Sequence, residues 1–361
     1  MSTHHNLAAL VQTRGAQQQT ESEITACIAT RDSSRFVFAT ALGEIITILR
    51  ATLRTPEQWI TTPIHDGPIL ALSMDTQSQS VLTGGDDGRL CRLTPSHTVE
   101  ELGKIRRWVE HITSFTGKEK QTDLIAVASG KQVELREATG KTILRTLEHS
   151  SAVGGIVFDP HGKYLAVSHY NGVSLWTTQS HTNTDTNADT PRFLEWKGSH
   201  LSIAIHPQGK SVVTAMQEND LHGWRLSDGH NMRMSGYPAK VRSLSFSHNG
   251  EWLATSGAPV VVVWPFHGDD GPIGKPPIEL PGIDNTLLCT QVAFHPTQEV
   301  LAAGFENGMV LLFELSTQRV LPVSLDTIGS VTALTYSPDG CLLGYGTENG
   351  NIGIIDLTAT H

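Results

Sequence analysis

The chain has 361 residues, of which 39% are hydrophobic and 17% are charged, a composition typical of a folded globular protein. Its formal net charge is −10, which disfavours nucleic-acid binding because phosphate groups would repel the protein. The apolar runs, such as 260–264, are far shorter than the roughly 20 residues that cross a bilayer, and the first ten residues do not resemble a signal peptide. We therefore expect a cytoplasmic protein with no membrane or nucleic-acid partner.

After an apolar stretch at 7–13, the chain repeats one pattern of short strands. Each copy has an alternating apolar strand, a turn rich in Pro, Asp and Gly, a second strand, a tight turn and a third strand. The fullest copy spans 156–176, and weaker copies occupy 24–49 and 111–136. The tight turns are commonly Asn-Gly or Asp-Gly, which predict β-hairpins because these residues tolerate positive φ.

The third strands of these copies indicate eight units, with a mean spacing of about 45 residues. Two spacings are longer, because 177–191 is a polar, low-complexity insertion and 265–282 is a Pro- and Gly-rich loop. No linker separates one half of the chain from the other, so we predict a single domain over 1–361. The expected ends of the third strands are Leu49, Leu93, Leu135, Trp176, Trp224, Trp264, Phe313 and Ile355.

Through its turn signatures and the tryptophans Trp176, Trp224 and Trp264, the chain resembles the WD-repeat family of β-propellers over nearly its whole length. The resemblance implies an all-β propeller of eight four-stranded blades, with seven, the usual number in this fold, as the alternative. It also implies that both chain ends complete one blade, and residues 1–16, with the apolar stretch 7–13, are the predicted closing strand. The chain has no Trp-Asp dipeptide, and its Pro-His-Gly-Lys stretch is more similar to bacterial stand-alone members than to eukaryotic assembly subunits.

The sequence contains no motif for nucleophilic, metal-dependent or nucleotide-dependent catalysis. Three histidines, His65, His149 and His200, each begin a first strand and together could ring one face, although in this family a histidine there normally braces its own blade. We predict no enzymatic activity, no cofactor and no metal site. The alternative is a metal-linked or small-molecule propeller enzyme, similar to a lactonase, or an accessory protein in metal handling.

The alternation of strands predicts which loops lie together. If the strands of a blade are named a to d, the b–c turns and d–a connections share one face, which we call the first face. The a–b turns, the c–d loops and both long insertions share the opposite, second face. Three acidic residues occupy one equivalent position in the b–c turns, where the turn itself makes no demand for an acid. They are Asp86, Glu306 and Glu348.

Such a set of acidic residues favours a partner with a basic surface. We therefore predict a monomeric scaffold that binds a protein partner, with an Arg/Lys-rich segment, across the first face. An ordinary solvated acidic rim is the alternative interpretation. The predicted contact residues are Asp86, Glu218, Glu306, Glu348, His65, His149 and His200.

Overall fold

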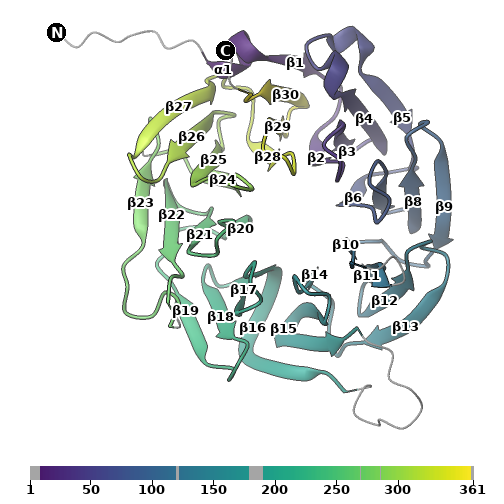
Figure 1. Ribbon diagram of the computed structural model, residues 1–361, viewed down its shortest axis with the longest axis vertical. Helices are drawn as coiled ribbons and strands as arrows, with labels where there is room; N and C mark the ends of the chain where they lie inside the picture. The colour runs from purple at the N-terminus through teal and green to yellow at the C-terminus, as the bar shows by residue number, and fades with distance from the viewer. Residues whose placement is uncertain (1–8, 119–121, 179–189, 269, 285, 359–361) are drawn as a thin grey trace.

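The computed structural model describes residues 9–118, 122–178, 190–268, 270–284 and 286–358. Within these residues the regular secondary structure is almost entirely β-strand, apart from the short helix α1 (Leu10–Arg14) and two 3-10 turns, η1 (Arg50–Thr52) and η2 (Pro56–Gln58). Neighbouring strands are antiparallel throughout the described pairings, and the sheets stand in a ring around a central axis (Figure 1). The predicted all-β propeller is confirmed.

Six sheets of the described part have four strands each. The first three are β2–β5 (Ile24–Ala29, Arg35–Thr40, Glu44–Leu49, Ile60–Pro63), β6–β9 (Ile69–Met74, Val81–Gly85, Arg89–Leu93, Val99–Lys104) and β10–β13 (His111–Phe115, Leu124–Ser129, Gln132–Glu137, Ile143–Glu148). The last three are β20–β23 (Leu244–Phe246, Trp252–Thr255, Val260–Pro265, Ile278–Pro281), β24–β27 (Cys289–Phe294, Val300–Phe305, Val310–Glu314, Arg319–Ser324) and β28–β30 with β1 (Val331–Tyr336, Leu342–Thr347, Asn351–Asp356, Gly15–Gln19).

The remaining sheet has six strands: β14 (Gly155–Phe158), β15 (Tyr164–Thr177), β16 (Arg192–Ile205), β17 (Ser211–Met216), β18 (Leu221–Arg225) and β19 (Asn231–Met234). β15 turns back on itself at Asn171 (φ 71°) and Gly172 (φ 144°), and beyond its ends the N–H of Thr178 donates to the carbonyl of Lys163 at 3.1 Å. β16 pairs with β15 through its first half and with β17 through its second half.

The six-stranded sheet therefore carries two consecutive sequence units. Counted as continuous sheets of described residues, the ring has seven, which matches the seven-bladed alternative. Seven sheets nevertheless contain all eight sequence units, since the sheet that contains β15 and β16 is made of two units. The predicted third-strand ends all lie on third strands: on β4, β8, β12, the second half of β15, β18, β22, β26 and β30.

The first strands lie nearest the centre of the ring and the fourth strands form its outer rim (Figure 1). Between these, the second and third strands are largely buried on both faces, which is why most of them are rich in apolar residues. All six residues of β17, for example, are buried. The core lies between adjacent sheets: Val37 and Ile45 of one sheet share a cluster with Ile69 and Val81 of the next. The ring is held together by these contacts between neighbouring sheets.

The ring closes through the N-terminal segment, but the closing strand lies further along the chain than predicted and overlaps the predicted segment only at Gly15 and Ala16. The closing strand is β1, Gly15–Gln19, which pairs antiparallel with β30, whereas the predicted strand was 1–16. The described part of the apolar stretch forms α1 instead, and Val11 packs with Ile355 and Leu343 in the core of the last sheet. Residues 1–8 lie outside the described part.

The long insertions also follow the prediction only in part. The segment 177–191 connects β15 to β16, and its residues 179–189 lie outside the described part. The predicted loop 265–282 contains the fourth strand β23, which pairs with β22. Among the described residues, no helix is long and apolar enough to span a membrane.

Candidate interaction face

Backbone hydrogen bonds confirm the two sets of loops. On the first face, the N–H of Ile105, in a d–a connection, donates to the carbonyl of Gly88, in a b–c turn, at 2.8 Å. On the second face, the N–H of Leu226, in a c–d loop, donates to the carbonyl of Lys210, in an a–b turn, at 2.8 Å. The loops of each face are therefore joined to one another, and each face is a firm surface on which side chains can be positioned.

The histidines predicted on the first face brace the units from within. His65 Nε2 lies 2.9 Å from the hydroxyl of Thr83, and its Nδ1 lies 3.0 Å from Asp87 Oδ1. Asp87 in turn accepts the N–H of Arg89 at 2.9 Å, inside the b–c turn. His65 is only 6% exposed, and this burial lowers its pKa despite the nearby Asp87 carboxylate, which acts in the opposite direction. His65 is therefore a neutral, buried residue that stabilises its own unit, and it is not a surface contact.

His200 and His149 have similar positions in their own units. His200 is 2% exposed; its Nδ1 lies 2.7 Å from the Thr214 hydroxyl, and its Nε2 lies 2.9 Å from the carbonyl of Trp196. His149 is half-buried and accepts the indole N–H of Trp176 at 3.1 Å. Burial, with a contribution from His169, lowers the pKa of His149 to about 4. These imidazoles hold turns and strands together.

The sequence analysis did not identify a similar hydrogen-bonded residue in the unit that contains Trp264, because a tyrosine takes the place that a histidine has in other units. Tyr237 is 9% exposed, and its hydroxyl lies 2.7 Å from the hydroxyl of Thr255. The same oxygen accepts the indole N–H of Trp264 at 2.6 Å. The signal that could have found it is the Trp264 at the end of the third strand, since the other two such tryptophans are preceded by histidines at the corresponding first strands.

The acidic residues Glu306 and Glu348 lie on the first face and are exposed. Each carboxylate accepts a backbone N–H of the neighbouring d–a connection: Glu306 from Leu288 at 3.0 Å, and Glu348 from Ser330 at 2.9 Å. In both cases the backbone of the acidic residue also donates to the same connecting residue, at 3.0 Å and 2.9 Å. The turn itself makes no demand for an acid at these two positions, but the adjoining d–a connection uses a side-chain acceptor at both.

Asp86 and Glu218 are placed differently. Asp86 lies against Gly67, so closely that a Cβ on Gly67 would be 2.2 Å from Asp86 Oδ1. Glu218 is exposed in the turn between β17 and β18, directly before Asn219, which has positive φ. The structure thus brings Asp86, Glu306 and Glu348 to equivalent turn positions, with Glu218 one position later.

A pocket of about 430 Å³ opens beside Asp86 on the first face. It lies between the turn that contains Asp86 and the d–a connection that carries Arg106, Arg107 and Trp108. The Trp108 side chain is 58% exposed. An exposed tryptophan beside arginines is typical of protein interfaces, where both residue types are enriched.

Exposed apolar side chains gather on the first face as a whole. Of the fourteen large apolar side chains that are exposed in the described part, eight belong to b–c turns, d–a connections or the starts of first strands, whereas only Ile273 belongs to a second-face loop. The other five lie on outer strands. The eight are Leu42, Leu70, Trp108, Tyr170, Leu201, Ile283, Leu325 and Ile328.

The described residues contain no group of three His, Cys, Asp or Glu side chains placed to hold a metal ion. The four cysteines are free thiols, and burial raises the pKa of Cys91 to about 11, so that this thiol is protonated at neutral pH. The first face offers apolar anchors, carboxylates and a few basic residues, which is a surface chemistry suited to binding.

The fold and its turns define a β-propeller built from repeated four-stranded units. The family model "WD domain, G-beta repeat" matches residues 141–177 and 229–264, and each match includes a third strand that carries a tryptophan. The model "Anaphase-promoting complex subunit 4 WD40 domain" matches residues 292–361. The chain is a WD-repeat β-propeller.

The chain is also similar to several curated proteins. The chain is 23% identical to Protein HIR1 of Candida albicans over 313 residues, 80% of this chain and 32% of HIR1. It is 27% identical to the Protein LST8 homolog of Drosophila melanogaster over 129 residues, 36% of this chain and 39% of that protein. WD repeat-containing protein 90 of Homo sapiens is 28% identical over 44% of this chain and 9% of its own length. The chain thus spans less than two fifths of these relatives, and the likeness supports an interaction-scaffold role in general terms.

Proposed function

We propose that this protein is a scaffold that docks a protein partner across its first face. The observation that carries the proposal is the distribution of exposed large apolar side chains, which among the described residues favours the loops of the first face over those of the second by eight to one. Docked partners bury such side chains at the centre of an interface, where aromatic residues contribute most of the binding energy. Trp108, beside its pocket, is the expected anchor.

The charge of the first face indicates the kind of partner. In its turns and connections acidic residues outnumber basic ones, and the bracing histidines do not offset the difference, because burial lowers the pKa of His65, His149 and His200. A partner segment rich in Arg and Lys would be attracted to such a face and would associate faster at low salt. Asp86 and Glu218, together with Glu306 and Glu348, are the proposed charged contacts.

The test compares capture of binding proteins from the native cell by three forms of the purified protein. Trp108→Ser with Ile328→Ser removes two apolar side chains from the first face, and Ile273→Ser is a matched change on the second face. We expect the wild type and Ile273→Ser to capture the same partner and the first-face variant to lose it. Loss with Ile273→Ser and retention with the first-face variant would overturn the proposal.

The charged contacts need a change that spares the fold. Glu306→Gln with Glu348→Gln keeps the Oε1 acceptor for Leu288 and Ser330 while it removes two negative charges. Once the partner is in hand, this variant should associate more slowly and show a weaker dependence on salt. An unchanged association rate at low salt would exclude these two residues as contacts.

A monomeric, cytoplasmic and non-catalytic protein is part of the same proposal, as is the absence of nucleic-acid and membrane partners. The alternative of a metal-linked or lactonase-like propeller makes a separate prediction, which is stoichiometric metal in the purified protein. Elemental analysis of protein prepared without chelators tests it directly.

A further inference from the structure

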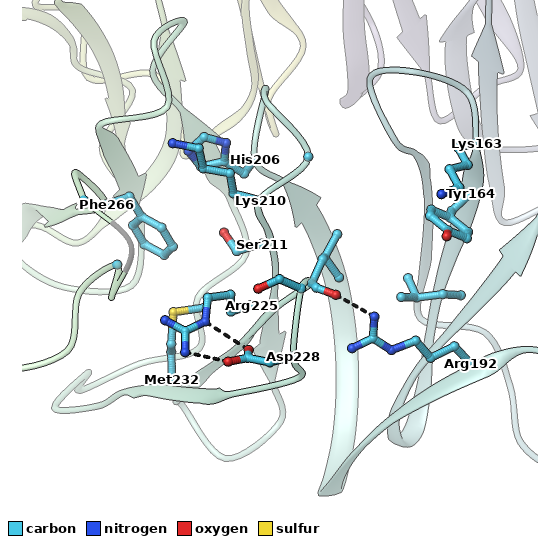
Figure 2. A pocket seen from close by; sticks show the side chains of 16 residues that line it. Lys163, Tyr164, Arg192, His206, Lys210, Ser211, Arg225, Asp228, Met232 and Phe266 are labelled. Atoms are coloured by element: carbon cyan, nitrogen blue, oxygen red, sulfur yellow. Dashed lines mark hydrogen bonds and ion pairs between the residues drawn. The ribbon is translucent and has the colours of Figure 1, made fainter.

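The second face contains a pocket that the proposed docking of a partner does not use. It has a volume of about 680 Å³, within the roughly 300–1,000 Å³ range of small-molecule sites. Its walls come from three consecutive units: the a–b turn that carries Lys163, the a–b turn that carries Lys210, and the c–d loop that begins with Phe266 (Figure 2). Both long insertions start at this face, after β15 and β22.

The lining of this pocket is basic although the chain as a whole is acidic. Four lining side chains are cationic, Lys163, Arg192, Lys210 and Arg225, and one is a carboxylate, Asp228. Arg225 is neutralised by Asp228, at 2.6 Å, and by Asp270, at 3.2 Å. The guanidinium of Arg192 donates to the carbonyl of Leu226 at 2.5 Å. This hydrogen bond holds the guanidinium in place, but a neutral carbonyl does not neutralise its charge.

Three positive charges are therefore left without a carboxylate among the described residues, those of Lys163, Lys210 and Arg192. The imidazole of His206, beside Lys210, adds no further charge, because burial lowers its pKa. Three cations that line one pocket from separate parts of the chain favour an anion with several negative charges, and phosphate groups suit both the ammonium and the guanidinium geometry.

A buried hydroxyl in the wall of the pocket points to a ligand independently of charge. Ser211 is 5% exposed, and its Oγ has no hydrogen-bond partner among the described residues. Figure 2 shows this oxygen on the side of the pocket where Phe266 lies, between Lys210 and Arg225. A buried hydroxyl without a partner costs free energy, and a ligand oxygen in the pocket would satisfy it.

Part of the wall is apolar. Phe266 and Met232 lie together, since both approach Gly271, and Tyr164 and Leu175 line the pocket as well. Aromatic and thioether groups of this kind accommodate the flat ring of a ligand. The pocket thus combines a cationic part with an apolar part.

We propose that this pocket binds a small molecule that carries phosphate groups on a ring-containing body. Lys163, Lys210 and Arg192 bind the phosphates, the Ser211 hydroxyl bonds to a ligand oxygen, and Phe266 contacts the ring. The site is on the opposite face from the proposed partner surface, so either proposal can fail without the other.

The probe is adenosine triphosphate, titrated into the whole protein at low salt by calorimetry, with inorganic triphosphate and adenosine as companions. We expect one molecule of adenosine triphosphate to bind, inorganic triphosphate to bind more weakly, and adenosine alone not to bind. Lys163→Glu with Lys210→Glu should weaken binding about tenfold or more, whereas Lys104→Glu with Lys131→Glu, equal in charge but outside the pocket, should change it little.

Ser211→Ala separates a ligand-binding role from a structural one. Because the variant removes a buried hydroxyl that has no partner, its unfolding midpoint should stay the same or rise, while its affinity for adenosine triphosphate falls several-fold. The proposal is overturned if adenosine triphosphate does not bind at millimolar concentration, or if neither the double lysine variant nor Ser211→Ala weakens it. Inorganic triphosphate that binds as tightly as adenosine triphosphate would refute the role of Phe266.

Discussion

Replacing Tyr237 with Phe should destabilise the protein by about 2 kcal/mol, because one oxygen atom serves two hydrogen bonds. The Tyr237 hydroxyl donates to Thr255 Oγ1, which itself donates to the carbonyl of Val262, and it accepts the indole N–H of Trp264. Thr255 is fully buried. The substitution leaves the aromatic ring in place and removes both hydrogen bonds. The half-buried indole N–H of Trp264 is then left without a partner, and the hydrogen bond to Thr255 is lost.

Urea unfolding at pH 7, followed by tryptophan fluorescence, measures this loss as a lower midpoint with an unchanged slope. Tyr164→Phe is the matched control, because no hydrogen bond of its hydroxyl is described, and it should shift the midpoint little. In a double-mutant cycle with Trp264→Phe, the two changes should couple by about 1 kcal/mol. A Tyr237→Phe effect below about 0.5 kcal/mol would show that this brace contributes nothing measurable.

Three further changes test closure, core and pH dependence. Deleting residues 1–19 removes α1 and β1 and exposes the edge of β30, so it should lower the unfolding midpoint and cause self-association in light scattering; an unchanged midpoint would contradict this closure. Trp224→Ala should cost roughly 3–5 kcal/mol in urea unfolding, since Trp224 is 1% exposed, and a cost under about 1 kcal/mol would argue against its core position. Burial lowers the pKa of His222 to about 4, so between pH 6.5 and 4 the unfolded chain binds a proton that the folded chain does not. The free energy of unfolding should therefore decrease as the pH is lowered from 6.5 to 4. The decrease should be smaller in His222→Asn, which lacks this imidazole.

The strands of this fold could be predicted because they have local signals. The hairpin turns at Asn171-Gly172 and at Asn307-Gly308 need positive φ, and the sequence supplies residues that tolerate it. Strands buried on both faces are rich in apolar residues, as in β17 (Ser-Val-Val-Thr-Ala-Met). The way in which units combine into sheets depends on where the last strand of one unit continues into the first strand of the next, as in β16. No local feature of the sequence predicts this continuation.

The closing strand could not be predicted, for a physical reason. β1 has the sequence Gly-Ala-Gln-Gln-Gln and forms the exposed edge of its sheet, so neither apolar alternation nor hydropathy marks it. It is a strand because β30 offers a free edge and because the side chain of Gln17 donates to the hydroxyl of Tyr345 at 2.6 Å. The preceding apolar residues form a helix, since they seal the end of the core beside Ile355 instead of extending a sheet.

The acidic positions show why a candidate contact cannot be read from turn geometry alone. Within the b–c turn, nothing requires Glu306 or Glu348, and the sequence supports a binding role for them on that ground. The requirement comes from the connection that leads in from the preceding unit, whose backbone presents the N–H groups of Leu288 and Ser330 to these carboxylates. Each of these bonds uses only Oε1, so the second oxygen and the negative charge remain on the first face. Stabilisation of the face and attraction of a basic partner are therefore compatible in the same two side chains, and the glutamine variants separate the two because an amide keeps the acceptor and loses the charge.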